Sequence, residues 1–257
     1  MRPNIRRERI EKMVRERERV TVDALAELLG TSRETIRRDL TDLAERGRVR
    51  KFHGGATVAE PRLPEVDIEG PFQGRLLANA EAKRAIAKRA IQLFEPGDTL
   101  FVDTGTTTLH FAEELALASG LTVITNSAAI AALAARGASN TTFLIGGEYR
   151  AESTENLGPL AIEQISQFHA VHAVLAVGSV ETVGILDYDL READVARAMI
   201  AQSRSVTVLA DGSKFGRGGL IKIAPLDAIQ RVVTEAEPPE EIAYALKNAG
   251  VTVVMAS

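Results

Sequence analysis

Residues 31–43 read TSRETIRRDLTDL, a pattern that predicts a short amphipathic helix. Thr31 is placed to cap this helix, and Glu34, three residues later, can reach back to the cap. The apolar residues that recur on one face, which we expect to be buried, are Ile36, Leu40 and Leu43. This segment should therefore pack one face against neighbouring helices and expose the other.

Two more helices are predicted before it. Residues 6–17 carry an apolar stripe on an otherwise charged segment, formed by Ile10, Met13 and Val14. A second stripe stops at Gly30 and is formed by Val22, Leu25, Ala26, Leu28 and Leu29. Glycine readily adopts the left-handed conformation that ends a helix, so Gly30 predicts a tight turn. The two helices on either side of Gly30 are typical of a helix-turn-helix.

The third helix also carries a polar surface. Four residues lie off its apolar stripe and should point outward near its N-terminal end, namely Arg33, Thr35, Arg37 and Arg38. In helix-turn-helix proteins this end of the second helix of the motif enters the major groove of DNA. The guanidinium groups can contact phosphates or recognise guanine through paired hydrogen bonds, and both roles stay open for each arginine.

Residues 46–58, RGRVRKFHGGATV, predict a β-wing after the third helix. The segment contains a Gly-Gly turn, and cations fill most of the positions before it. Arg48, Arg50 and Lys51 can hold phosphates, and His53 can contact DNA.

Charge is distributed unevenly along the chain. Residues 1–58 contain 15 Lys and Arg against 10 Asp and Glu, a net charge of +5, whereas the remainder contains 16 against 25, a net charge of −9. Only the first part suits a polyanion such as double-stranded DNA. A plain three-helix packing module is the alternative, but the capping box, outward arginines and cationic wing favour DNA binding. The predicted DNA-binding residues are Ser32, Arg33, Thr35, Arg37, Arg38, Arg48, Arg50, Lys51 and His53.

The composition narrows the class of protein further. The chain has 257 residues, 45% of them hydrophobic and 26% charged, as expected for two globular domains. No apolar run reaches the roughly 18 residues of a membrane span, so we expect a cytoplasmic protein without a membrane partner. Cysteine is absent, which excludes disulfides and thiolate nucleophiles. His169 and His172 would lie on opposite faces of a strand, so the sequence predicts no metal site, and it predicts no cofactor.

Residues 59–74 predict a linker, because three prolines and two glycines interrupt any regular period there. The predicted domains are therefore residues 1–58 and 75–257. Within the second domain, residues 79–94 predict a helix, and helical segments then alternate with short β-rich runs. These runs are residues 99–102, 121–124, 141–145, 171–177, 206–209 and 251–255. Such alternation is typical of an α/β domain with a mostly parallel sheet covered by helices.

The residues that follow the predicted strands are candidates for ligand binding, since ligands bind beyond the carboxyl ends of parallel strands. Residues 103–108, DTGTTT, place a glycine and four threonines between a strand and a helix. Backbone amides at a helix N-terminus attract anions, and threonine hydroxyls can donate hydrogen bonds to phosphate. Capping is the alternative role, but a single threonine would be enough for it. We therefore favour a phosphate site.

Three more loops show similar features. Residues 125–127 place Asn and Ser before an alanine-rich helix, where capping is an equal alternative. Residues 146–150 begin with paired glycines that allow close backbone approach, and Arg150 can add charge. The stretch from this loop to residues 158–159 is also a candidate mobile flap. Residues 211–217 contain Lys214, which we predict to be a second phosphate contact, with an exposed surface lysine as the alternative.

Together these motifs, in residues 20–30, 32–40 and 47–55, resemble the DeoR family of bacterial repressors, and the resemblance continues to the C-terminus. That family joins a winged helix-turn-helix to a sensor domain similar to ribose-5-phosphate isomerase. Its members typically repress sugar-catabolism operons until a phosphorylated intermediate releases them. The resemblance therefore implies a DNA-binding repressor of a sugar or polyol catabolism operon, with operator DNA and a sugar-phosphate effector as partners.

The resemblance also implies that the four loops converge on one sugar-phosphate site, because the family shows D-x-G-T-T, T-N-S, G-G and A-D-x-S-K-F-G motifs. The predicted effector-binding residues are Asp103, Thr104, Gly105, Thr106, Thr107, Thr108, Asn126, Ser127, Gly146, Gly147, Asp187 and Lys214. Two positions depart from the family. Residues 176–179 read AVGS where G-x-D-G is common, and Ala196 stands where Lys is common. A different effector, a reshaped pocket and lost sensing are all compatible with these departures.

A sugar-phosphate isomerase-like enzyme with an accessory DNA-binding arm is the alternative function. It would need a carboxylate base and an electrophile, and Asp187, Glu192 or Asp194 with Lys214 could fill these roles. Carboxylates in such a place more often lie at the positive end of the next helix, residues 191–203. A DNA-binding domain also has little use on a metabolic isomerase, so we expect no enzymatic activity.

A palindromic operator would require at least a dimer, which presents two recognition helices to half-sites related by a two-fold axis. We therefore expect a homo-oligomer, whose interface the sequence does not locate. We also expect ligand binding to reorient the linker and so to change the separation of the DNA-binding units. The resemblance implies release from the operator, and activation is the alternative.

Overall fold

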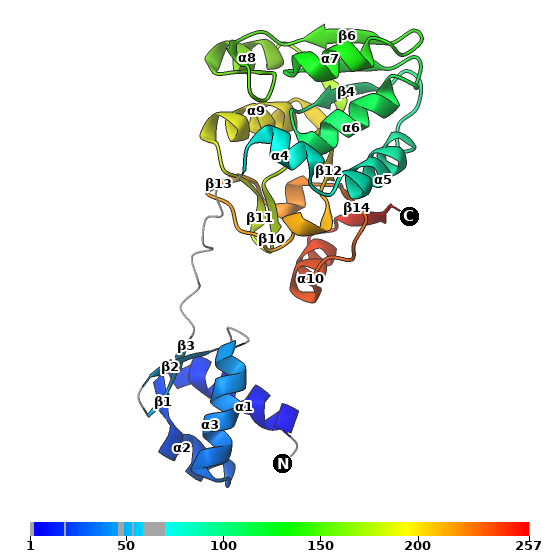
Figure 1. Ribbon diagram of the computed structural model, residues 1–257. Coiled ribbons are helices and arrows are strands. Elements are labelled where there is room, and N and C mark those ends of the chain that lie inside the picture. Colours follow the sequence, from blue (N-terminus) through cyan, green and yellow to red (C-terminus); the bar gives the residue numbers. More distant parts are fainter. Residues whose placement is uncertain (1–2, 18, 46–48, 53, 59–69, 257) are drawn as a thin grey trace. The chain divides into compact units, whose positions relative to one another are not determined.

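The computed structural model of the protein describes residues 3–17, 19–45, 49–52, 54–58 and 70–256. The chain forms two compact units, Met1–Leu63 and Pro64–Ser257 (Figure 1). Among the predicted DNA contacts, Arg48 and His53 lie outside the described residues, as does most of the predicted linker. Residues 72–74, at the end of that linker, form the start of helix α4 (Phe72–Leu77).

The described part of the first unit consists of three helices and a three-stranded sheet. Its helices are α1 (Pro3–Arg17), α2 (Val22–Leu29) and α3 (Arg33–Glu45), and its strands are β1 (Arg19–Thr21), β2 (Val49–Phe52) and β3 (Gly55–Val58). The strands pair antiparallel in the order β1-β3-β2. The predicted helix-turn-helix and wing are therefore confirmed. The sequence does not predict β1, because three residues are too few to show a period.

Packing in the first unit follows the predicted apolar stripes. The buried side chains that hold the three helices together include Ile10, Val14, Leu25, Ile36 and Leu40. Gly30 is left-handed at φ 59° and ends α2 as predicted. The prediction is wrong for Leu28, whose side chain is 51% exposed. The inward face of α2 runs along Val22, Leu25 and Leu29, and Leu28 lies beside that line.

The cap of α3 differs from the predicted one. The helix begins one residue after Ser32, so Ser32 rather than Thr31 occupies the N-cap position. Ser32 Oγ accepts the Thr35 N–H at 3.2 Å, whereas the Thr31 N–H bonds back to α2. Glu34 does not close a capping box. Its carboxylate faces two arginines of the next turn, at 3.7 and 3.9 Å.

The second unit is an α/β domain built on a parallel sheet, which confirms the predicted fold class. Its helices include α4, α5 (Ala80–Ile91), α6 (Thr106–Leu115), α7 (Ala128–Ala134), α8 (Pro159–Ile165), α9 (Leu190–Ala201) and α10 (Glu240–Asn248). Its main strands are β4 (Thr99–Val102), β5 (Thr122–Thr125), β6 (Thr141–Leu144), β9 (Ala170–Ala176), β12 (Ser203–Leu209), β14 (Arg231–Thr234) and β15 (Thr252–Met255). In the described residues these seven strands run parallel in the order β15-β14-β12-β9-β4-β5-β6. Only β14 among them is absent from the sequence prediction, because its four residues show no clear period.

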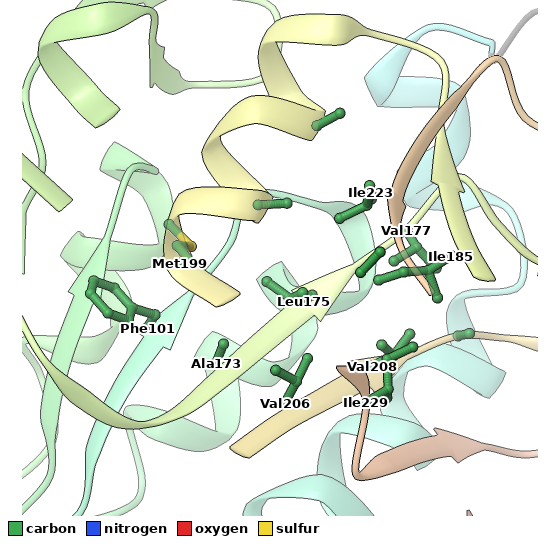
Figure 2. Close-up of a cluster of buried hydrophobic side chains, with 14 of the residues drawn as sticks. Phe101, Ala173, Leu175, Val177, Ile185, Met199, Val206, Val208, Ile223 and Ile229 are labelled. Atoms are coloured by element: carbon green, nitrogen blue, oxygen red, sulfur yellow. The ribbon is translucent and has the colours of Figure 1, made fainter. Parts of the chain in front are cut away.

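Helices cover both faces of this sheet (Figure 1). Helices α5, α6 and α7 pack on one face, while α8, α9 and α10 pack on the other. Both faces of the sheet are apolar, as strand β4 shows. Its Phe101 is buried against one helical layer, and the neighbouring Leu100 and Val102 are buried against the opposite layer. Figure 2 shows Phe101 and Leu175 on the strands beside Met199 of α9.

Two smaller sheets complete the described part of the second unit. Strands β10 (Ser179–Glu181), β11 (Gly184–Asp187) and β13 (Ile221–Ala224) pair antiparallel, and β7 (Glu148–Arg150) pairs antiparallel with β8 (Glu155–Leu157). Strand β11 ends at Asp187, three residues before α9 begins at Leu190. Within the described ranges, no helix is long and apolar enough to cross a membrane.

Candidate functional site

The outer face of α3 is the first candidate site. Buried side chains such as Ile36 fix the inner face of the helix, so the arginines of the other face point into solvent. The side chains of Arg37 and Arg38 are 67% and 81% exposed. Arg33 Nε lies 2.7 Å from Asp23 Oδ1 in an exposed ion pair, which contributes little to stability. Positive charge is therefore concentrated on the exposed face of α3.

Polar contacts surround this face. The hydroxyls of Ser32 and Thr35, which are also predicted to contact DNA, lie 2.8 Å apart at the N-terminus of α3. Arg50 and Lys51 of β2 are exposed, and Lys51 Nζ donates a hydrogen bond to Thr41 Oγ1 on α3 at 2.9 Å. The wing is thus tied to the helix whose arginines it flanks.

A buried ion-pair cluster fixes the orientation of α3. Asp39 is buried and accepts hydrogen bonds from Arg6 Nε at 2.5 Å and Arg7 Nε at 3.2 Å. The hydrogen bond from Arg6 to Asp39 raises the pKa of Arg6, so this guanidinium stays charged. Sequence reasoning misses the role of Asp39, because charged residues of a helix usually face water and Arg6 is 33 residues away.

A cavity of about 450 Å³ opens in the second unit, and it is lined by Gly70, Pro71, Phe72, Arg75, Arg150, Glu152, Ser153, Asp187, Tyr188, Asp189, Glu192 and Leu220. A smaller hollow shares Arg75, Asp187 and Glu192 with it. The other residues that line the small hollow are Thr104, Gly105, Thr106, Thr107, Ala176, Val177, Gly178 and Lys214. These residues follow β4, β9 and β12, so the hollow lies at the carboxyl edge of the sheet.

The small hollow is built around the N-terminus of α6. Glycine is required at position 105, because a Cβ atom there would lie 2.3 Å from the Ala176 Cβ. Thr106 and Thr107 are the first residues of the helix, and both are buried. The first N–H groups of an α-helix have no partner within the helix, so they can bind an anion.

Side-chain hydrogen bonds hold the loop that carries these residues in place. Thr104 Oγ1 donates to Asn126 Oδ1 at 3.0 Å, and Thr108 Oγ1 donates to a carbonyl of the same loop at 3.1 Å. Asp103 is buried and accepts the Thr104 N–H at 2.8 Å. Of the six residues predicted here, residues 104–107 line the hollow, whereas Asp103 and Thr108 do not.

Four other predicted residues line neither the small hollow nor the large cavity, namely Asn126, Ser127, Gly146 and Gly147. Asn126 Nδ2 donates to a carbonyl of β8 at 3.3 Å, and Ser127 Oγ caps α7 at 3.4 Å. Gly146 donates its N–H to a side chain of α8 at 2.9 Å. At Gly147 a Cβ atom would lie 2.6 Å from a carbonyl oxygen of β8. These residues hold the surrounding loops in place, a role that their position after the strands cannot distinguish from ligand contact.

Arg150 joins three carboxylates at the wall of the large cavity. Its guanidinium nitrogens lie 2.5 Å from Glu192 Oε1, 2.7 Å from Asp189 Oδ2 and 3.3 Å from Glu155 Oε1. The cluster therefore ties the β7–β8 hairpin to the start of α9. Although burial lowers the pKa of Arg150, its bond to Asp189 and the nearby negative charges raise it. Sequence reasoning offers Arg150 only as an added charge and does not identify its partners Glu155 and Asp189.

Carboxylates crowd around the cavity, and their pKa values differ. Burial, together with the charges of Glu155 and Asp187, raises the pKa of Glu192 to about 8. Burial and the same two neighbours raise the pKa of Asp103 well above its ordinary value. Burial would also raise the pKa of Asp189, but hydrogen bonds from the backbone and from an arginine lower it. At neutral pH Glu192 is therefore mostly protonated, whereas Asp189 is ionised.

Lys214 and Arg75 bring positive charge to the small hollow. Lys214 ends the short 3-10 turn Gly212–Lys214, whose start is capped by the buried Asp211. Arg75 comes from α4, and the buried ammonium group of Lys83 donates to carbonyls at the end of that helix. Sequence reasoning identifies Lys214 but misses Arg75, because α4 carries no motif and its first residues lie in the predicted linker.

Packing explains the two departures from the family motifs. A Cβ atom at Gly178 would lie 2.8 Å from the ring of Tyr188, which fills the space beside it. Tyr188 also lines the large cavity and donates its hydroxyl to the Gly218 carbonyl at 2.7 Å. Ala196 is buried in the hydrophobic cluster between α9 and the sheet, where an unpaired lysine would be strongly disfavoured. An aromatic ring thus shapes the cavity next to the position where the family commonly has Asp.

The carboxylates considered as a catalytic base do not all meet. Asp187 and Glu192 line the small hollow together with Lys214, whereas Asp194 pairs with Arg197 at 2.7 Å on an exposed part of α9. In the described part of the chain, no group of three or more His, Asp or Glu side chains could hold a metal ion.

Known proteins match both units. A family model described as the DeoR-like helix-turn-helix domain matches residues 6–62, and one described as the DeoR C-terminal sensor domain matches residues 78–236. A solved structure of ribose 5-phosphate isomerase A from Methanocaldococcus jannaschii aligns with 55% of this chain and 56% of its own, at 17% identity and a TM-score of 0.40.

Curated relatives match over most of their length. The transcriptional repressor AccR of Agrobacterium fabrum is 34% identical over 90% of this chain and 89% of its own. The glycerol-3-phosphate regulon repressor of Escherichia coli is 31% identical over 92% of each chain, and the transcriptional repressor CsqR of the same species is 29% identical over 98% of this chain and 95% of its own. The chain therefore belongs to the DeoR family of DNA-binding transcriptional regulators, as its motifs predict.

Proposed function

We propose that the protein represses an operon for sugar or polyol catabolism and that a phosphorylated sugar or polyol releases it from operator DNA. The observation that carries this proposal is the small hollow at the N-terminus of α6, where buried threonines meet Lys214 and Arg75. Helix N-termini with nearby cations are suited to phosphate. The name of the related glycerol-3-phosphate regulon repressor supports an effector of this class.

The small hollow and the large cavity together suggest how such a ligand is oriented. The phosphate group binds in the small hollow, against the N–H groups of Thr106 and Thr107. The carbon chain extends into the large cavity, where Asp187 and Asp189 accept hydrogen bonds from hydroxyl groups. Glu192 is mostly protonated, so it can donate a hydrogen bond without repelling the anion. A phosphorylated polyol satisfies both regions, and its unphosphorylated parent satisfies only one.

The start of the second unit offers a route from the ligand to the DNA-binding unit. Gly70, Pro71 and Phe72 line the large cavity and belong to the last part of the predicted linker, residues 59–74. Phe72 is buried, and the guanidinium of Arg75 lies 5.5 Å from the centre of its ring. A ligand that contacts Arg75 therefore acts on the segment from which the linker departs. Two positions of α4, one favoured by the ligand, would couple the two binding events.

We propose that the cavity binds its ligand without converting it. Sugar-phosphate isomerisation needs a carboxylate that is free and ionised at neutral pH. Glu192 is bound by Arg150 at 2.5 Å, and its pKa of about 8 keeps it mostly protonated. Asp187 accepts the Tyr188 N–H at 2.7 Å. These contacts favour recognition of hydroxyl groups over proton abstraction.

A thermal-shift screen tests the proposal. The full chain is heated with a panel of sugar and polyol phosphates, including glycerol 3-phosphate, and with their unphosphorylated parents as controls. Binding to the folded state stabilises it by about 2.7 kcal/mol at a ligand concentration of 100 Kd. We expect one phosphorylated compound to raise the melting temperature and to release the protein from a DNA site selected from a random pool. Stabilisation by no phosphorylated compound, or equally by its parent, would contradict the proposal.

A further inference from the structure

Within the part of the chain that the structure describes, strand β6 lies at one edge of the main sheet and pairs with β5 alone. The Thr141 N–H donates to the Leu121 carbonyl at 2.9 Å, and the Ile145 N–H donates to the Thr125 carbonyl at 2.8 Å. Successive residues of a strand direct their backbone groups to opposite sides. The N–H and C=O groups of residues 142 and 144 therefore point out of the sheet.

These outward groups are open along the middle of β6. At the end of the strand, the next outward N–H, that of Gly146, is bound by Gln164 of α8 at 2.9 Å. Among the described residues, no partner occupies the outward N–H groups of Thr142 and Leu144. The buried Thr142 Oγ1 has no hydrogen-bond partner there either. The edge is thus closed at one end and available for pairing at its centre.

Exposed apolar side chains accompany this open edge. Phe143 is 43% and Leu144 is 50% exposed, and they lie on opposite faces of the sheet. Leu160 of the neighbouring helix α8 is exposed as well. Figure 1 shows α7, β6 and α8 together at one end of the second unit. An exposed, apolar edge strand is a site at which another strand pairs.

Charge is almost absent from the sequence of this edge. Residues 116–147, which contain α7 and β6, include a single charged residue, Arg136, although 26% of the chain is charged. The opposite edge strand, β15, is preceded by a charged segment, residues 235–247, that contains four glutamates and a lysine. Charged residues protect an edge strand from association, and their depletion marks the core of an interface. Both edge strands are themselves uncharged, and the difference lies in the segments beside them: residues 235–247 bring charge close to β15 in the sequence, whereas Arg136 is the one charged residue in residues 116–147.

We propose that the β6 edge is the interface with a second copy of this chain. The two β6 strands pair antiparallel about a two-fold axis at Phe143, so residue 142 of each copy faces residue 144 of the other and exchanges both N–H···O bonds. The two Phe143 side chains then lie side by side on one face of a sheet that continues through both protomers. The same surface serves on both partners, as a two-fold interface requires.

The low charge of this surface favours a second copy of the chain as the partner. Residues 116–147 carry one charge, that of Arg136, and the neighbouring helix α8 adds the exposed Glu163, so few like charges would meet between two copies of this surface. A strongly acidic or basic partner would find no opposite charge on residues 116–147 beyond Arg136. A two-fold dimer also suits a palindromic operator.

Cross-linking tests the register directly, because the chain contains no cysteine. Opposed residues at a non-hydrogen-bonded position have Cβ atoms about 4.5–5.5 Å apart, within reach of a disulfide after small adjustments. We expect the full-length Phe143→Cys variant to form a covalent dimer on mild oxidation. Leu144→Cys is the matched control, since each residue 144 faces residue 142 of the other copy. Met255→Cys is a second control on the opposite edge strand. Equal cross-linking of all three variants would overturn the proposal.

Charge exchange provides a second test that does not depend on oxidation. Phe143→Lys and Phe143→Glu each place like charges together at the axis, so each variant alone should sediment as a monomer at concentrations where the unmodified chain is a dimer. Mixing the two variants should restore the dimer, which a folding defect could not do. Dimers in both separate variants, or a monomeric unmodified chain at micromolar concentration, would refute the interface. Neither experiment requires DNA or an effector, so the outcome is independent of the proposed function.

Discussion

Arg150 Nη1 lies 2.5 Å from Glu192 Oε1, and this contact joins the β7–β8 hairpin to the first turn of α9 at the cavity wall. Glu155 and Asp189 hold the same guanidinium from two other directions. The cation therefore organises the wall of the cavity before any ligand binds. A phosphorylated ligand would meet a surface in which most polar groups are already positioned, which reduces the entropy lost on binding.

The raised pKa of Glu192 predicts a pH-dependent stability. Its pKa rises from the ordinary value of 4.5 to about 8 in the folded protein. The folded state then binds a proton more tightly than the unfolded state, so the free energy of unfolding should fall as the pH rises from about 4.5 to about 8. Glu192→Gln cannot ionise and should show a flatter profile. Denaturant unfolding of both proteins between pH 5 and 9 measures the difference, and parallel profiles would contradict the prediction.

Removal of Asp39 should destabilise the first unit. Asp39→Ala leaves the guanidiniums of Arg6 and Arg7 without the carboxylate that holds α1 against α3. Loss of one partner from a buried ion pair costs about 3 kcal/mol, and the misaligned α3 should also weaken DNA binding. Glu34→Gln is the control, because its exposed carboxylate contributes little. Hydrogen exchange of α1 and α3 amides measures the local loss, and equal protection in both variants would show that Asp39 has no such role.

Arg37 and Arg38 should carry much of the DNA affinity. Replacing both by Ala should weaken operator binding by 10-fold or more, since each good base contact contributes roughly 1–3 kcal/mol and each phosphate contact adds to the salt dependence. Ligand-induced thermal stabilisation should be unchanged. Arg84→Ala with Lys88→Ala on the exposed face of α5 removes the same charge from the second unit and serves as the control. Unchanged affinity in a fluorescence anisotropy titration would disprove the assignment of α3 as the recognition helix.

Thr106 and Lys214 should be needed for the response to the effector. Thr106→Val with Lys214→Met removes a hydroxyl and a cation from the small hollow, and a hydrogen bond to a charged group contributes roughly 1.5–3 kcal/mol. We expect binding of the phosphorylated ligand to weaken by about 10-fold or more while DNA binding is retained. Lys222→Met, on the exposed side of β13, controls for the loss of charge. If the double variant still leaves DNA at the original ligand concentration, the phosphate binds elsewhere.

Local pattern alone is enough to predict helix α3 with its outward arginines and the threonine-rich loop after β4. The spacing of Ile36 and Leu40 places one face of α3 in the core, and the geometry of a helix then puts Arg37 and Arg38 outside. The run of threonines after β4 likewise indicates a helix N-terminus at the carboxyl edge of a parallel sheet. The start of α3 is not fixed by local pattern, because Thr31 and Ser32 are both good caps and a shift of one residue exchanges them.

The composition of the cavity depends on contacts between distant segments. Arg75, Arg150 and Glu192 reach the same wall from α4, β7 and α9, which the order of the strands brings together. Hydrophobic periodicity reports on neighbours within a turn or a strand, whereas strand order depends on pairing between segments far apart in the chain. The motifs therefore indicate a regulator with a candidate anion site, whereas the tertiary fold decides that Arg75 lines the small hollow, that Arg150 lies in the wall of the large cavity and that β6 is an edge strand of the described sheet.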